Sequence, residues 1–102
     1  MKVFVVESFR SGETLRLGLF DNIEPAMKAI DEHFYPTWTN MSGYTLKQAT
    51  VDEAGDYDRI FYSVPKEQLD LTLDQALKHE VCITYIVSSY IVNEPIRETV
   101  FN

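Results

Sequence analysis

The stretch that most constrains the fold is residues 81–92, which read Val-Cys-Ile-Thr-Tyr-Ile-Val-Ser-Ser-Tyr-Ile-Val without a charge, glycine or proline. Nearly all of these residues are β-branched, aromatic or small, as is typical of a strand inside a sheet. Twelve residues suffice for a strand that crosses a small domain, but they are too few to span a bilayer as a helix. The sequence therefore predicts a sheet organised around this strand.

The two faces of this strand differ in polarity. Because side chains alternate along a strand, Ile83, Tyr85 and Val87 share one face, whereas Thr84, Ser88 and Tyr90 share the other. We expect the first set to meet helices and to be more buried than the second.

Two predicted strand pairs precede the long strand. Residues 2–8 and 14–20 flank a segment that contains a glycine, as in a hairpin, and residues 44–52 and 59–64 flank an acidic connection. In the strand over 14–20 the alternation places three leucines, Leu15, Leu17 and Leu19, on one face.

Two helices are predicted from capping signals. An Asx cap precedes a helical stripe of apolar residues, and this helix, over 23–35, is expected to end before Pro36. A capping box at Thr72 predicts a shorter helix that reaches about residue 79. Residues 96–102 could add one more short strand.

The predicted fold is therefore α+β, with an antiparallel or mixed sheet of about five strands and two helices on one face, in the order ββαββαβ. Residues 1–102 are predicted to form a single globular domain. The last strand or the tail is a candidate sheet edge through which two copies could form a homodimer.

Charge and cysteine content limit the partners and the compartment. Nine basic and sixteen acidic residues leave a net charge of −7, which disfavours nucleic acid and anionic membranes as partners. A single cysteine, Cys82, allows no intramolecular disulfide and fits a reducing compartment. With no signal-peptide pattern at the start of the sequence, we expect a cytoplasmic protein, in its own cell or in a host.

An aromatic loop is the first candidate partner-binding surface. The segment 35–44 has no periodicity but contains Tyr35, Trp38, Met41 and Tyr44, and such residues are enriched at interface hot spots. Trp38 also has a structural interpretation, in which it folds back to cap the end of the sheet.

An acidic segment is the second candidate partner-binding surface and contains Asp52, Glu53, Asp56 and Asp58. The spacing of these acids does not match a calcium-binding loop, and aspartate with glycine is ordinary for a solvated turn. We therefore predict no metal here. If these acids converged with Asp31 and Glu32 on one side, the protein could imitate the charge of DNA.

Catalytic chemistry is not indicated. Cys82 lies three residues after His79, but a lone cysteine in an apolar strand is usually a small core residue. His33 has no further metal ligands nearby in the sequence and is expected at the surface. The sequence predicts neither a catalytic residue nor a cofactor, and we do not expect an enzyme.

Two functions remain open. The first is a small acidic protein-interaction module, an inhibitor or regulator of another protein, of the kind that phages and bacteria use as accessory proteins. The alternative is a small-molecule-binding domain whose pocket lies between sheet and helices or at a dimer interface.

Overall fold

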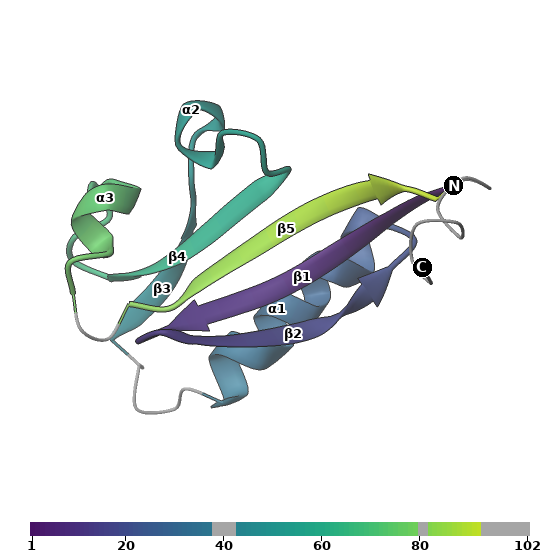
Figure 1. The fold of residues 1–102 in the computed structure, drawn as a ribbon. Coiled ribbons are helices and arrows are strands. Elements are labelled where there is room, and N and C mark those ends of the chain that lie inside the picture. Colours follow the sequence, from purple (N-terminus) through teal and green to yellow (C-terminus); the bar gives the residue numbers. More distant parts are fainter. Residues whose placement is uncertain (38–42, 80–81, 93–102) are drawn as a thin grey trace.

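The structure is a computed structural model, and it describes residues 1–37, 43–79 and 82–92. These residues contain five strands and three helices, of which α2 and α3 are single turns (Figure 1). The elements are β1 Lys2–Arg10, β2 Glu13–Phe20, α1 Ile23–Thr37, β3 Tyr44–Gln48, α2 Val51–Ala54, β4 Arg59–Pro65, α3 Leu73–Ala76 and β5 Thr84–Ile91.

All five strands belong to one antiparallel sheet with the order β2-β1-β5-β4-β3. The prediction of an α+β fold with a sheet of about five strands is confirmed. The long strand, β5, is central, because it pairs with β1 on one side and β4 on the other. It is therefore not a sheet edge, and the edges are β2 and β3. Pairing of two copies through an edge stays a prediction.

The two faces of the β5 stretch differ in burial as predicted at Ser88 and Tyr90, whereas Thr84 is buried as well. Tyr85 and Val87 are fully buried and Ile83 is 2% exposed. On the other face Thr84 is 7% exposed and Tyr90 is 57% exposed. The polar face loses its cover toward the end of the strand, which leaves Tyr90 accessible.

The first hairpin turns through two residues, Ser11 and Gly12, which have φ angles of +50° and +83°. Positive φ at both central residues is the type I′ geometry, whose twist suits antiparallel strands. The predicted hairpin is confirmed, and the turn brings Arg10 opposite Glu13 in the register.

A β-bulge in this hairpin overturns the prediction that three leucines share one face of β2. The register shifts between Val6, which pairs with Gly18, and Glu7, which pairs with Arg16, so Leu17 is the extra residue. Beyond the bulge the alternation is inverted, and Leu19 pairs with Val5 on the face away from α1. A Cβ at Gly18 would lie 3.0 Å from Cζ of Phe20, so the bulge fits a glycine.

Helix α1 lies against the face of β1 and β2 that appears at the back of Figure 1. Its predicted apolar stripe is confirmed, since Ala26, Ile30 and Phe34 are buried in a cluster with residues of β1, β4 and β5. The Asn22 side chain caps the helix by accepting a hydrogen bond from the Glu24 N–H at 3.1 Å. The helix ends at Thr37 and includes Pro36 in its last turn, so the predicted end before Pro36 is wrong by two residues.

The two short helices cover the opposite face, so the prediction of two helices on one face is wrong. A second cluster contains Ile60, Tyr62 and Val64 of β4 together with Ala54 of α2 and Ala76 of α3. Strand β4 is apolar on both faces, since Phe61 belongs to the α1 cluster, and each face therefore needs its own cover. Both short helices begin with a capping box, of which the one at Thr72 was predicted.

The described helices include none that is long and apolar enough to cross a membrane. The short strand predicted over residues 96–102 lies outside the described residues.

Candidate functional site

Two residues of the predicted aromatic loop are described, Tyr35 near the end of α1 and Tyr44 at the start of β3. The Tyr35 side chain is half exposed, and its hydroxyl lies 3.4 Å from the Thr45 hydroxyl. Tyr44 is partly buried against the core cluster under α1. Trp38 and Met41 lie outside the described residues, so both interpretations of Trp38 stay open.

The predicted acidic residues lie at the other end of β3. Asp52 and Glu53 belong to α2, and Asp56 and Asp58 follow in the connection to β4. The described residues of the sequence-predicted site therefore lie on two surfaces at opposite ends of β3.

Glu53 is engaged in holding the two short helices together. Its Oε1 accepts a hydrogen bond from the Thr50 N–H at 2.9 Å, and its Oε2 accepts one from the Leu73 N–H at 2.8 Å. The first bond completes the capping box of α2 and the second reaches the first residue of α3. Both carboxylate oxygens thus have backbone donors, and we leave Glu53 out of the candidate site.

These bonds lower the pKa of Glu53, with the Leu73 N–H as the largest cause and the Thr50 N–H as the next. A carboxyl group with a lowered folded-state pKa stabilises the fold above its unfolded-state pKa. That stabilisation is lost as the pH falls through the lowered, folded-state pKa.

Substitution of Glu53→Gln is expected to lower the free energy of unfolding by about 1–2 kcal/mol at pH 7, because the amide nitrogen cannot accept one of the two bonds. Urea denaturation followed by circular dichroism measures the change, with the exposed Glu67→Gln as control. The difference between wild type and variant should shrink in acid, where the wild-type carboxylate is protonated. Equal stability at pH 7 would contradict this role of Glu53.

A groove of about 400 Å³ lies where the α2–β4 connection meets the end of β5. The Asp58 N–H donates to the Val87 carbonyl at 3.0 Å, which fixes this connection beside β5. We call this site the acidic groove, and it is lined by Ala54, Gly55, Asp56, Tyr57, Asp58, Ser88, Ser89 and Tyr90.

The acidic groove combines carboxylates with exposed aromatic rings. Asp56 and Asp58 are exposed, and neither is paired with a cation among the described residues, where the ion pairs are Arg16–Glu7 and Lys28–Glu32. Tyr57 is 48% exposed and Tyr90 is 57% exposed. Carboxylates and tyrosine rings are the groups that bind guanidinium and ammonium ions. The groove can therefore receive a basic side chain.

Sequence reasoning identified the two aspartates of the groove but missed its tyrosines and serines. Tyr57 stands between Asp56 and Asp58, so the signal for it was present in the acidic segment. Ser88 and Tyr90 were assigned to the less buried face of the last strand, but nothing in the sequence places that face beside residue 57.

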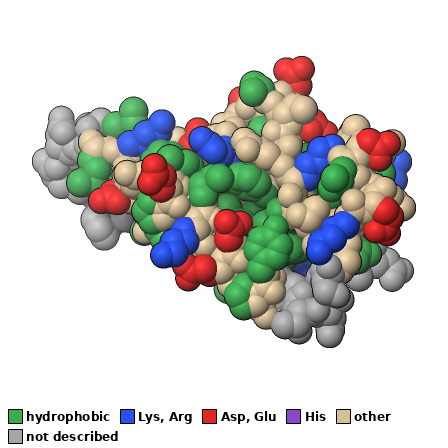
Figure 2. Space-filling model, turned by 180° about the vertical axis from the view of Figure 1, so that it is seen from behind, with side chains coloured by type: hydrophobic (Ala, Val, Ile, Leu, Met, Phe, Trp, Pro, Cys, Tyr) green, Lys and Arg blue, Asp and Glu red, His purple; other side chains and the backbone are tan. Residues whose placement is uncertain are grey.

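Asp31 and Glu32 do not converge with the four acids of residues 52–58 on one side of the molecule. Asp31 and Glu32 lie on α1, on the opposite side of the sheet from α2. Figure 2, seen from the α1 side, shows hydrophobic side chains at the centre with acidic and basic side chains interspersed around them. The separation of these six acids over two sides of the sheet does not support imitation of DNA, which needs acids concentrated on one face.

Cys82 has the environment of a core residue. It is buried, and burial is the largest cause that raises the pKa of its thiol. Its Sγ lies 3.9 Å from the Ser63 carbonyl, to which it donates weakly. A thiol with a raised pKa is a poor nucleophile.

In the described ranges 1–37, 43–79 and 82–92 no three acids, histidines or cysteines come together as a metal site would require.

Comparisons with protein-family models, with curated proteins and with solved structures found no match. Function is therefore inferred from the sites themselves, because a fold alone does not define a function.

Proposed function

We propose that the protein is a cytoplasmic protein-interaction module that binds a basic segment of a partner protein through the acidic groove. The observation that carries this proposal is the pair of aspartates, Asp56 and Asp58, that flank an exposed tyrosine and line the same groove as a second one, Tyr90. An arginine or lysine of the partner would place its charge between the carboxylates and its stem against the rings.

Hydrogen bonds hold the segment that supports the groove, which favours binding. Helix α2 is closed by a capping box, and the connection after it is hydrogen-bonded to β5 through the Asp58 N–H. A site that is already ordered loses less conformational entropy when the partner binds. The net charge of −7 adds a long-range attraction for basic partners, which raises the association rate.

A module of this kind would act as an inhibitor or regulator by occupancy. While the acidic groove is bound to a basic surface of the partner, other acidic ligands cannot bind that surface. The acidic groove alone is small for a stable interface, so a partner would also contact surface outside the groove.

Affinity capture from a native extract tests this proposal. We expect the immobilised wild type to retain a basic protein, and the double variant Asp56→Asn with Asp58→Asn to lose it. The matched control is Glu67→Gln with Asp70→Asn, which removes two exposed charges elsewhere. Equal retention by all three proteins would contradict the groove as the binding site.

A further inference from the structure

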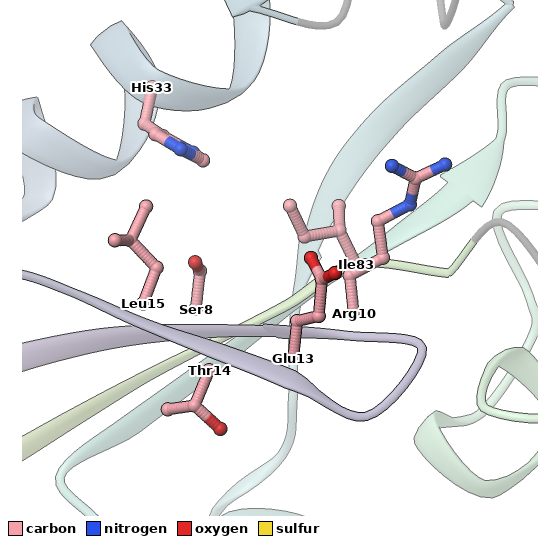
Figure 3. A pocket seen from close by; sticks show the side chains of 7 residues that line it. All are labelled: Ser8, Arg10, Glu13, Thr14, Leu15, His33 and Ile83. Carbon is pink, nitrogen blue, oxygen red and sulfur yellow. The ribbon is translucent and has the colours of Figure 1, made fainter.

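A second, larger cleft of about 450 Å³ opens between α1 and the turn end of the β1–β2 hairpin (Figure 3). It lies on the α1 face of the sheet and at the start of β5, whereas the acidic groove lies at the end of β5. The cleft is lined by Ser8, Arg10, Glu13, Thr14, Leu15, His33 and Ile83.

Ser8 places a buried polar group in this cleft. The residue is 6% exposed, and its hydroxyl makes no hydrogen bond to any of the described residues. Figure 3 shows the hydroxyl directed from β1 into the space below His33. A buried hydroxyl without a partner is costly, so a group that can bond to it is favoured at this position.

His33 closes the cleft from the side of α1. Its Nδ1 lies 2.7 Å from the Tyr85 hydroxyl, and the two rings meet edge to face at 5.6 Å. Contrary to the prediction of a surface histidine, the ring is half-buried, and burial lowers its pKa, so the neutral form is favoured near pH 7. Because Tyr85 fixes the ring at Nδ1, Nε2 is the nitrogen that a ligand would meet, as donor or acceptor according to the tautomer.

The remaining walls combine balanced charge with apolar surface. Arg10 and Glu13 are partners in the strand register, so one positive and one negative side chain stand at the same end of the cleft. Leu15 and Ile83 provide the aliphatic walls between this pair and His33 (Figure 3). The cleft therefore offers several hydrogen-bonding groups and apolar surface but no net charge.

From these observations we infer that the cleft is a binding site for a small uncharged molecule, one that carries hydrogen-bonding groups along one edge and an apolar face. The polar edge would bond to the Ser8 hydroxyl and His33 Nε2, and the apolar face would pack on Leu15 and Ile83. A nucleoside or an aromatic amide has this chemistry. The site is independent of the acidic groove, and it would add a ligand-dependent function to the protein.

Amide-resolved NMR titrations test the inference with a matched set of probes that share one ring. Benzamide is uncharged, whereas benzoate is an anion and benzylamine a cation at pH 7; adenosine and methyl glucoside are further uncharged probes. We expect at least one uncharged probe to cause saturable shifts at Leu15, His33 and Ile83, and benzoate and benzylamine to bind more weakly than benzamide.

The variant Ser8→Ala should lower the affinity for the uncharged probe about fivefold to tenfold, as expected for one lost hydrogen bond. Its melting temperature without ligand should equal or exceed that of the wild type, because an unsatisfied buried hydroxyl has been removed. Ser88→Ala, in the acidic groove, is the control and should leave the affinity unchanged. The inference is overturned if no uncharged probe shifts these residues, if a charged probe binds best, if Ser8→Ala leaves the affinity unchanged, or if it lowers the melting temperature.

Discussion

Replacement of Tyr62 by alanine is expected to lower the free energy of unfolding by about 3–5 kcal/mol. Tyr62 is fully buried on the face of β4 that α2 and α3 cover. Its hydroxyl donates to the Leu71 carbonyl at 2.9 Å, and the Lys47 ammonium lies 5.9 Å from the centre of its ring. The alanine variant would leave a cavity beneath both short helices, and these single turns have little stability of their own.

The variant Tyr62→Phe separates packing from hydrogen bonding at this position. It keeps the ring and removes the hydroxyl, while the Leu71 carbonyl still accepts a bond from Lys47 Nζ at 2.9 Å. We expect a loss of about 1 kcal/mol. Urea denaturation followed by circular dichroism measures both variants. A loss below about 1 kcal/mol for Tyr62→Ala would show that this face of the sheet is not a packed core.

Replacement of Phe34 by alanine is also expected to lower the free energy of unfolding by about 3–5 kcal/mol. Phe34 lies on the opposite face of the sheet from Tyr62. Phe34 is buried under α1, where its ring meets Tyr85 edge to face at 6.3 Å and Tyr35 at 4.8 Å. Its loss would open a cavity in the first core cluster and loosen the side of α1 that carries His33.

The exposed Leu77→Ala is the matched control for Phe34→Ala, and it should change stability by no more than about 0.5 kcal/mol. Thermal and urea unfolding report the difference. If Phe34→Ala behaved like Leu77→Ala, α1 would not cover this face. Large losses at both Phe34 and Tyr62 are expected only when both faces of the sheet are covered.

Much of this fold could be predicted from local sequence signals. The uncharged run over 81–92 indicated the strand that became β5, and the alternation within it identified Tyr85 and Val87 as core. The capping box at Thr72 and the apolar stripe from Ala26 to Phe34 placed two of the three helices. These features depend on residues that are close to one another in the sequence.

The features that were not predicted depend on contacts between distant segments. The bulge at Leu17 arises from pairing with β1, so the alternation within residues 14–20 could not reveal that Leu19 changes face. Helix α2 is a single turn whose capping box is completed by Glu53, which is also bonded to Leu73 twenty residues later. The distribution of helices over two faces follows from the burial of both sides of β4.

In the candidate sites, too, local features could be predicted from the sequence, whereas contacts between distant segments could not. The aspartates of the acidic groove were visible as a charged segment, but Tyr90 joins them only because β5 runs beside the α2–β4 connection. Nothing in the sequence distinguishes Ser8 from another small strand residue. Only the fold places it in one cleft with His33, which is 25 positions away in the chain.

The central claim, that the acidic groove binds a basic segment, is tested most directly by calorimetric titration with a synthetic peptide that carries two arginines. The wild type should bind, with an affinity that falls as salt is added. The double variant Asp56→Asn with Asp58→Asn should bind at least about tenfold more weakly, since each charge-assisted bond contributes about 1.5–3 kcal/mol. The control Glu67→Gln with Asp70→Asn should bind like the wild type. The same affinity for all three proteins, or an affinity that salt leaves unchanged, would contradict the account.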